Sequence, residues 1–212
     1  MSEEERMIEA FNEGIDIHTK TAMDVFHIPF EEVDSHIRRQ AKAINFGVVY
    51  GISDFGLSKQ ASLSIKEAKH FIEEYFRTYP KIKEYMDKQV EFCKENGYVK
   101  TMMNRRRYIK EINDANYMTK EFGKRAAMNS PIQGSAADLI KMAMIRIDAL
   151  MEEKNLKSKM ILQVHDELIF DVAEDEIDIM KEIITNGMAN AYKLKVALSS
   201  SLAMGKTWYE AK

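Results

Sequence analysis

The sequence predicts an α+β fold: a mostly helical first half, followed by a helix, two strands, a helix and a last strand. Apolar residues recur at helical spacing through most of the chain, which predicts helices. Between residues 159 and 172 the pattern changes to two short apolar runs around a polar turn, which is typical of a β-hairpin. The 212 residues are enough to bury a sizeable core.

Specific residues delimit the helices of the first half. Ser64 and Glu67 have the spacing of a capping box, which predicts that a helix begins there. Pro80 and Gly97 mark the two ends of a second amphipathic helix. Residues 98–118 show little periodicity, so we expect a loop-rich connector there.

The second half alternates between the two periods. A long amphipathic helix is expected over residues 136–151. Residues 159–164 and 168–172 are expected to form the strands of the hairpin. A helix over residues 174–192 and a last strand over residues 194–204 complete the prediction.

Composition excludes several classes of protein. The single cysteine, Cys93, excludes a disulfide scaffold and a cysteine-rich zinc module, and it fits a reducing compartment. No run of about 20 apolar residues occurs, so we expect no membrane-spanning helix. The acidic segment from Met1 to Arg6 does not have the pattern of a secretory signal.

The charges are unevenly distributed. Although the net charge of −3 argues weakly against a nucleic-acid partner, residues 38–146 carry a balance of +9, between balances of −8 over residues 1–37 and −4 over residues 147–212. A basic centre of this kind is typical of a protein that binds a polyanion. A solvated surface of lysine-rich helices would give the same pattern, so charge alone leaves both interpretations open.

One segment places two cations and then two aromatic residues at steps of four, near one face of a helix: Arg38, Lys42, Phe46 and Tyr50. A nucleoside triphosphate is likewise a polyanion followed by a flat base. Arginine offers a fork for phosphate oxygens, lysine offers a mobile charge and a proton, and the rings offer stacking surfaces. The segment therefore indicates a nucleotide-binding helix.

An amphipathic helix with core aromatics and surface cations is the alternative interpretation of this segment. Cations and rings on the same face fit that alternative poorly. Gly47 and Gly51 are unfavourable in a helix interior, so they indicate either close approach by another group or the end of the helix.

Two adjacent carboxylates, Asp166 and Glu167, follow His165 at the expected hairpin tip. Clustered carboxylates suit hard divalent cations, and two Mg²⁺ ions can clamp the attacking and leaving oxygens of phosphoryl transfer. A charged turn without a metal is the alternative. A transition-metal site or a hydrolase would need a second cluster of ligands, which the sequence does not show.

A third segment carries long polar side chains, again at steps of four: Arg125, Asn129 and Gln133. Such side chains can reach minor-groove acceptors that every base pair presents, and so detect duplex geometry without a sequence preference. Capping and loop hydrogen bonds around Pro131 and Gly134 are the structural alternative. A basic run next to Tyr108 suits a phosphate backbone: Arg105, Arg106 and Arg107.

With these segments in this order, the chain resembles the bacterial family A DNA polymerases, the DNA polymerase I type. The segment RRQAKAINFGVVYG resembles the family's motif B of the fingers, and QVHDEL resembles motif C of the palm. The similarity runs from about residue 8 to residue 212 and includes DIHTKTA, YFRTYP, GYVKT, NRRRY, NSPIQGSAADLIK and GKTWYEAK. Asn104 stands where the family often has glycine.

The resemblance implies two subdomains. Residues 1–118 would be the fingers subdomain, with the motif B helix at about residues 36–50. Residues 119–212 would be part of an antiparallel palm subdomain, with the motif C hairpin at about residues 159–172.

The resemblance also implies roles for residues of the first segment and its neighbourhood. Arg38, Lys42 and His18 would contact the triphosphate of an incoming dNTP, and Lys42 would donate a proton to pyrophosphate. Phe46 would pack on the sugar and base, where phenylalanine rather than tyrosine implies discrimination against dideoxynucleotides. Tyr50 would lie at the templating position.

The other segments would bind metal and DNA. Asp166 would hold two catalytic Mg²⁺ ions with Glu167 nearby, and His165 would lie near the primer terminus. The remaining residues would contact primer–template DNA: Arg125, Asn129 and Gln133 the minor groove, and Arg105, Arg106 and Arg107 the template phosphates. The implied setting is replication and repair in the bacterial cytoplasm, associated with the nucleoid.

The family's motif A, a strand similar to DYSQIELR, does not occur in this sequence. Motif A carries the second metal-binding aspartate, and the thumb and both nuclease domains also have no counterpart here. We therefore expect a fragment that is inactive alone. The alternatives are a non-catalytic module that binds DNA or dNTP, and an inert fragment that self-associates through an exposed palm surface.

Overall fold

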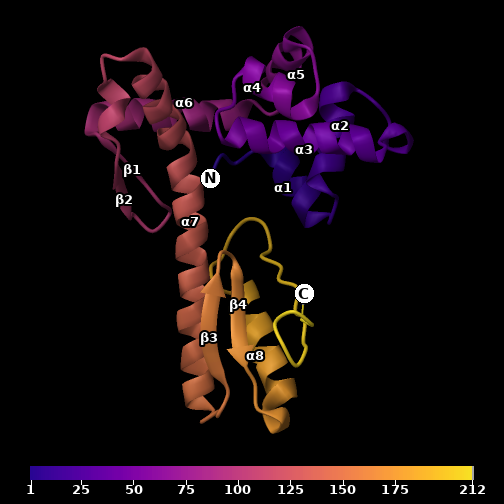
Figure 1. The fold of residues 1–212 in the computed structure, drawn as a ribbon, viewed down its shortest axis with the longest axis vertical. Helices are drawn as coiled ribbons and strands as arrows, with labels where there is room; N and C mark the ends of the chain where they lie inside the picture. The colour runs from indigo at the N-terminus through magenta and orange to yellow at the C-terminus, as the bar shows by residue number, and fades with distance from the viewer. Residues whose placement is uncertain (212) are drawn as a thin grey trace. The chain divides into compact units, whose positions relative to one another are not determined.

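The computed structural model describes residues 1–211, which form two compact units, residues 1–134 and residue 135 onward (Figure 1). This division falls inside one long helix, α7 (Tyr117–Glu153). Each unit has helices and a two-stranded antiparallel sheet, so the predicted α+β class is confirmed. The expected boundary after residue 118 differs from this division, and its assignment to fingers and palm stays a prediction.

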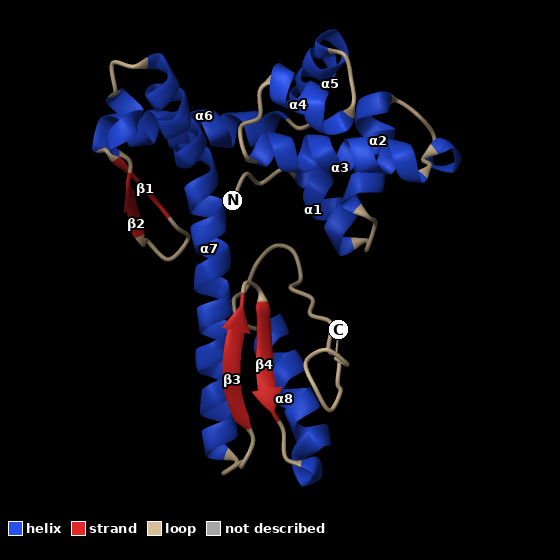
Figure 2. Ribbon diagram, in the orientation of Figure 1, coloured by secondary structure: helices blue, strands red, loops and turns tan. Residues whose placement is uncertain are grey.

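The first unit is largely helical (Figure 2). Its helices before α7 are α1 (Glu5–Asn12), α2 (Ile17–Phe26), α3 (Ser35–Val49), α4 (Asp54–Ala61), α5 (Ile65–Thr78) and α6 (Pro80–Asn96). The capping box predicted at the start of α5 is present, because Ser64 Oγ accepts from Glu67 N–H and the Glu67 carboxylate accepts from Ser64 N–H. Pro80 begins α6, and Gly97 ends it in the left-handed conformation. Both helices are therefore delimited as predicted.

The core of this unit lies among α2, α3, α4 and α5. Ile44, Leu57, Tyr75 and Tyr79 are completely or almost completely buried there. The buried residues of α3 include Ala41, Ile44 and Val48, whereas Arg38, Lys42, Phe46 and Tyr50 are exposed.

The segment expected to be a loop-rich connector is more ordered than predicted. It contains β1 (Tyr98–Lys100), β2 (Arg106–Tyr108) and the short 3-10 helix η2 (Lys110–Asn113). β1 and β2 pair antiparallel, with Tyr98 opposite Tyr108. Each strand has only three residues, and Val99 is the one buried residue of the two strands. The sequence therefore contains almost no alternation of apolar and polar residues from which these strands could be predicted.

Helix α7 begins earlier than expected. The prediction started it at Ala136, whereas the helix runs from Tyr117 and continues through Pro131. A proline inside a helix removes one backbone hydrogen bond and normally favours an end or a kink. Here Pro131 and Ala127 are buried, and this packing outweighs the local cost. The structural alternative, with a loop around Pro131 and Gly134, is therefore wrong, because α7 is continuous there.

The second unit packs one hairpin against helices. β3 (Lys159–Val164) and β4 (Glu167–Asp171) lie along α7 and α8 (Ile177–Ala189), with the 3-10 helix η3 (Glu174–Glu176) before α8 (Figure 2). Ile147, Met180 and Ile183 form the centre of this core. A Cβ atom at Gly187 would lie 2.2 Å from Ile147 Cγ1, so glycine lets α7 and α8 approach closely.

The end of the chain differs from the prediction. The helix expected over residues 174–192 begins as η3 and ends at Ala189. The strand expected over residues 194–204 is wrong, because no strand follows α8 in the described part of the chain. Three consecutive serines, residues 199–201, interrupt the apolar alternation, and no described strand pairs with this segment.

Candidate nucleotide and nucleic-acid site

Helix α3 displays the predicted cation–aromatic face to solvent. The helix occupies residues 35–49, as expected, and Asp34 caps it by accepting from the N–H groups of His36 and Ile37. Phe46 is 47 % exposed and Tyr50 is 49 % exposed. The alternative of core aromatics is therefore wrong: these rings lie on the surface with the cations.

Arg38, at the start of this face, is held by a carboxylate from another helix. Its Nε and Nη2 atoms donate to Asp16 Oδ2 at 2.9 Å and Oδ1 at 2.8 Å, a two-point ion pair. Asp16 also caps α2, because its Oδ2 accepts from the N–H and hydroxyl of Thr19. The hydrogen bond from Arg38 holds the pKa of Asp16 well below its usual value. The ion pair fixes the orientation of the Arg38 guanidinium. Its Nη1 atom takes no part in the two hydrogen bonds to Asp16.

Lys42 and His18 lie beside the Phe46 ring. Lys42 Nζ lies 5.8 Å from the ring centroid, and the His18 ring centroid lies 5.7 Å from it. Burial holds the pKa of His18 below its usual value, and the cations Arg38 and Lys42 lower it further, against the opposing effect of Asp16. The structure thus brings His18 from α2 together with three predicted residues of α3, although they are far apart in sequence.

The end of α3 is fixed by a glycine turn. Gly51 has φ +65°, and the N–H groups of Gly51 and Ile52 donate to the carbonyls of Val48 and Gly47, both at 2.8 Å. This pattern is a Schellman motif, which places Tyr50 at the C-cap, directly after the last helical residue, Val49. Gly51 thus marks the helix end, as one of the two sequence interpretations proposed.

Helix α7 approaches this end of α3. A Cβ atom at Gly51 would lie 2.6 Å from Met128 Cε and 3.0 Å from Arg125 Cγ. Asn129 Nδ2 donates to the Val49 carbonyl at 3.5 Å, which is a long contact.

Farther along α7, Gln133 Nε2 lies 3.4 Å from the Tyr50 hydroxyl, where it can donate. The first and third sequence segments therefore meet within the first unit. The side chains of Arg125 and Gln133 are exposed, whereas Asn129 is half-buried.

The β1–β2 hairpin places two of its basic residues against aromatic rings. The Arg106 guanidinium lies 4.8 Å from the Tyr98 ring centroid, and Lys100 Nζ lies 5.8 Å from the same centroid. The turn has Asn104 at φ +63°, a conformation that asparagine tolerates better than most residues. Three predicted arginines are exposed on this hairpin: Arg105, Arg106 and Arg107.

The β3–β4 turn and the first residue of β4 carry the predicted carboxylates, Asp166 and Glu167. Val164 pairs with Glu167, so His165 and Asp166 form the turn, with His165 at φ +54°. Gln163 Nε2 donates to the His165 carbonyl at 3.0 Å. Asp166 and Glu167 are exposed, and their oxygen atoms are the kind of ligand that Mg²⁺ prefers. Within residues 1–211 no group of three potential His, Cys, Asp or Glu ligands forms, so these two carboxylates fit Mg²⁺ only as part of a larger set.

Sequence reasoning missed two residues that organise the cation–aromatic face of α3 and His18 beside it, Asp16 and Asn45. Asp16 had a detectable signal, because aspartate is a preferred N-cap residue and Asp16 stands directly before the residues that form α2. Asn45 had a weaker signal: asparagine is unfavourable inside a helix, yet it stands next to Phe46 in the middle of α3.

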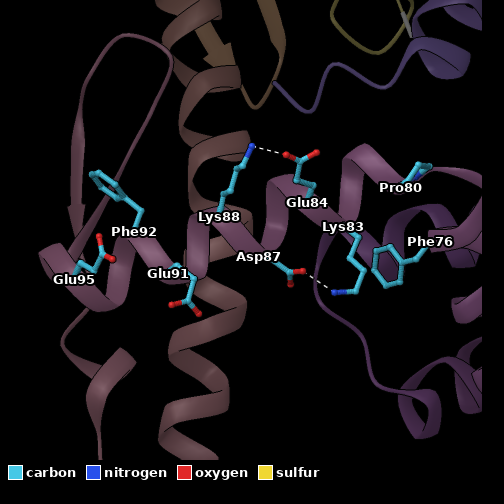
Figure 3. A pocket seen from close by; sticks show the side chains of 9 residues that line it. All are labelled: Phe76, Pro80, Lys83, Glu84, Asp87, Lys88, Glu91, Phe92 and Glu95. Atoms are coloured by element: carbon cyan, nitrogen blue, oxygen red, sulfur yellow. Dashed lines mark hydrogen bonds and ion pairs between the residues drawn. The ribbon is translucent and has the colours of Figure 1, made fainter.

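Two surface grooves lie away from all these residues. One, of 610 Å³, runs along α6 from Phe76 to Phe92 and is lined by the ion pairs Lys83–Asp87 and Lys88–Glu84 (Figure 3). The other, of 670 Å³, lies between the end of α7 and β3. Neither groove contains a predicted site residue. In the part of the chain that the structure describes, no helix is long and apolar enough to cross a membrane.

Comparison with known proteins gives consistent matches. The chain is 51 % identical to the DNA polymerase I of Caldicellulosiruptor bescii over 212 residues, which are all of this chain and 25 % of that protein. It is also 51 % identical to the DNA polymerase I of Bacillus subtilis, of which it covers 24 %. The chain thus spans about a quarter of the length of these relatives.

A solved structure and a family model agree with these relatives. The structure is the POL domain of Pol1 from M. smegmatis in complex with DNA primer-template and dNTP, with a TM-score of 0.93 and 41 % identity over 99 % of this chain and 37 % of that one. The family model described as DNA polymerase family A matches residues 1–210. Since the match covers almost every residue, the chain belongs to DNA polymerase family A.

Proposed function

We propose that this chain is the part of a DNA-directed DNA polymerase that binds the incoming nucleotide and the primer–template, for addition of dNTPs to a primer 3′-OH. The observation that carries the proposal is the exposed face of α3, where Arg38, Lys42 and Phe46 lie together with His18 of α2. The relative from M. smegmatis, whose complex holds primer-template and dNTP, supports the choice of ligand.

Each residue of this face has a distinct chemical task. The free edge of Arg38, oriented by Asp16, donates hydrogen bonds to phosphate oxygens. Lys42 adds a mobile positive charge and donates a proton to the departing pyrophosphate. Phe46 supplies an apolar surface for sugar and base, which underlies the proposed discrimination against dideoxynucleotides, and Tyr50 occupies the templating position at the end of α3.

The carboxylates of the β3–β4 turn are proposed to bind the catalytic metals. Asp166 would hold Mg²⁺, with Glu167 as an adjacent ligand and His165 near the primer terminus. When bound, the metal ions stabilise the charge that develops on the attacking and leaving oxygens. Two exposed carboxylates are too few for a two-metal site, so we propose that extension needs a further carboxylate beyond these residues and that the chain alone is inactive.

The DNA contacts are proposed for two other surfaces. Arg125 and Gln133 of α7, with Asn129 between them, would follow the minor groove next to the end of α3. The β1–β2 hairpin would contact template phosphates through three arginines: Arg105, Arg106 and Arg107. Replication and repair in the bacterial cytoplasm, near the nucleoid, are the proposed setting.

Binding of a fluorescent primer–template to the 212-residue chain tests the DNA part of the proposal. We expect affinity that falls as salt rises, and that weakens several-fold in Arg105→Ala and Arg125→Ala. Arg77→Ala is the matched control, because Arg77 pairs with Glu74 on α5. No binding at low salt, or equal losses in all three variants, would contradict the proposal.

Self-association is a second candidate function, favoured by one observation. Ile161 is 58 % exposed and Leu162 is 47 % exposed on β3, a strand paired only with β4 among the described residues. An apolar strand with an open edge favours pairing with another chain. Light scattering across protein concentration tests this: a dimer that Ile161→Lys returns to a monomer supports self-association, and a monomer throughout rejects it.

A further inference from the structure

A buried amide contacts His18 of the proposed nucleotide face, the surface formed by His18, Arg38, Lys42 and Phe46. Asn45 is 9 % exposed, and its Nδ2 lies 3.1 Å from His18 Nδ1. The same amide is held by Thr21, which is completely buried: the Thr21 hydroxyl lies 3.0 Å from Asn45 Nδ2 and 3.1 Å from Asn45 Oδ1. The Asn45 amide group is therefore positioned inside the α2–α3 interface, with its nitrogen towards His18 Nδ1.

This contact bears on which ring nitrogen carries a proton. With the amide nitrogen of Asn45 facing it, His18 Nδ1 accepts the hydrogen bond, because an amide nitrogen can only donate, and an accepting Nδ1 carries no proton. The imidazole is then neutral, and its one proton is on Nε2.

The charged groups facing His18 act on its charge in different directions. Arg38 and Lys42 of α3 disfavour a positive histidine, whereas Asp16 at the start of α2 favours one. A bound triphosphate would add several negative charges and favour protonation strongly. Without a group that blocks Nδ1, the charge of His18 would therefore depend on whether the nucleotide is present.

We propose that Asn45 is a positioning residue that keeps His18 in the neutral form with its proton on Nε2, so that His18 serves the nucleotide face as a hydrogen-bond donor and not as a cation. This inference rests on the proposed nucleotide site. Its consequence is that nucleotide binding is insensitive to the titration of His18 near neutral pH.

Nitrogen-15 NMR of the histidine side chains in the 212-residue chain tests the proton's position directly, with no nucleotide present. The His18 signal is assigned by its absence in His18→Gln. We expect a protonated Nε2 and an unprotonated Nδ1 between pH 6 and 8. A proton on Nδ1, or a doubly protonated ring at pH 7, would overturn the proposal whether or not the chain binds dNTP.

Asn45→Asp reverses the direction of the hydrogen bond to His18 Nδ1, with little change in the shape of the side chain. A carboxylate can only accept, so we expect a proton on His18 Nδ1, a raised pKa of His18, and dNTP affinity that increases about threefold to tenfold from pH 8 to pH 6. The unmodified chain should change by less than about twofold over that range, apart from the titration of the phosphate itself.

Two further variants keep this test decisive. Asn113→Asp adds the same charge at an exposed site on η2, where Asn113 donates to the Lys94 carbonyl, and it should leave the His18 signals unchanged. Thr21→Val, of similar size, removes the hydroxyl that holds the amide and should partly shift the His18 proton towards Nδ1. This variant serves as the test in place of Asn45→Asp if Asn45→Asp does not fold. If the histidine signals match the proposal but dNTP does not bind, the proposed function fails and the inference about Asn45 stands.

Discussion

The nucleotide face of α3 and the carboxylate turn between β3 and β4 differ in how firmly the chain itself holds them. On α3, Arg38 is fixed by a two-point ion pair to Asp16, and His18 is fixed by Asn45. At the turn, no hydrogen bond or ion pair within residues 1–211 holds the side chain of Asp166 or Glu167. The first region is organised before a ligand binds, whereas the second has no comparable support among the described residues.

The comparison shows why the two regions carry different parts of the proposed reaction. Binding a triphosphate needs oriented donors, which two packed helices can supply. A metal site needs several oxygen ligands around one point, and a single hairpin turn supplies too few of them. The chain can therefore be well folded and still lack a complete catalytic centre.

The largest effect is expected from Asp166→Asn in an active polymerase that contains this chain. Loss of a metal-binding carboxylate should reduce primer extension by about a thousandfold, since metal ions contribute several kcal/mol to phosphoryl transfer. Glu167→Gln, which changes the adjacent carboxylate, should cost less. Single-turnover extension measures both, and equal rates for Asp166→Asn and the unmodified enzyme would remove Asp166 from the metal site.

The junction of α3 with α7 should be the most sensitive to a small substitution. Gly51→Ala requires a left-handed alanine and also brings a Cβ atom against Met128 and Arg125, so we expect unfolding to become easier by about 2–3 kcal/mol. Gly14→Ala is the matched control, because Gly14 has φ +70° and no atom within 4 Å of its Cβ position. It should cost only about 1 kcal/mol.

Thermal and urea unfolding measure the two glycine variants. Equal losses would mean that backbone conformation alone matters, and that the approach of α7 to the end of α3 is not tightly packed.

Nucleotide affinity should separate two similar lysine–aromatic pairs. Lys42 lies 5.8 Å from the Phe46 ring centroid, and Lys59 lies 5.7 Å from the Phe55 ring centroid on α4. Only Lys42 has Arg38 and His18 beside it, so Lys42→Ala should weaken dNTP binding about tenfold and Lys59→Ala should leave it unchanged. Calorimetry measures the dNTP affinity of both variants. Similar affinities would show that the position of Lys42 on α3 does not matter for dNTP binding.

The smallest effect concerns the Asp16–Arg38 pair and pH. The lowered pKa of Asp16 means that the folded chain holds the carboxylate ionised, so its contribution to stability is present above the ordinary value of 3.8 and declines as pH falls below it. Because both side chains are about half exposed, Asp16→Asn should cost no more than about 1 kcal/mol at pH 7.

Urea unfolding at several pH values checks this prediction. Asp34→Asn is the control, since Asp34 caps α3 as Asp16 caps α2 but accepts only backbone N–H groups. A difference between Asp16→Asn and the unmodified chain that grows as pH falls from 5 to 3 would contradict the assigned direction.

Local signals made parts of this structure predictable. The capping box at Ser64, the helix end at Gly97 and the hairpin around Asp166 each depend on residues within a few positions of one another. The face of α3 was also predictable, because helical spacing alone aligns Arg38 with Phe46.

The parts that sequence reasoning missed depend on distant contacts. Asp16 binds Arg38 from 22 residues away, and Asn45 contacts His18 from 27 residues away. The helix continues through Pro131 because tertiary packing outweighs a local preference. The strand expected over residues 194–204 does not form, since a strand needs a partner that the local pattern cannot reveal.

The central claim is that the nucleotide face is organised independently of the carboxylate turn. Calorimetric titration of dNTP into the 212-residue chain tests it most directly, with Arg38→Ala/Lys42→Ala compared with Asp166→Asn/Glu167→Gln. We predict that the first double variant loses measurable binding and that the second binds within about twofold of the unmodified chain. Binding that survives loss of Arg38 and Lys42, or that disappears with Asp166 and Glu167, would contradict the claim.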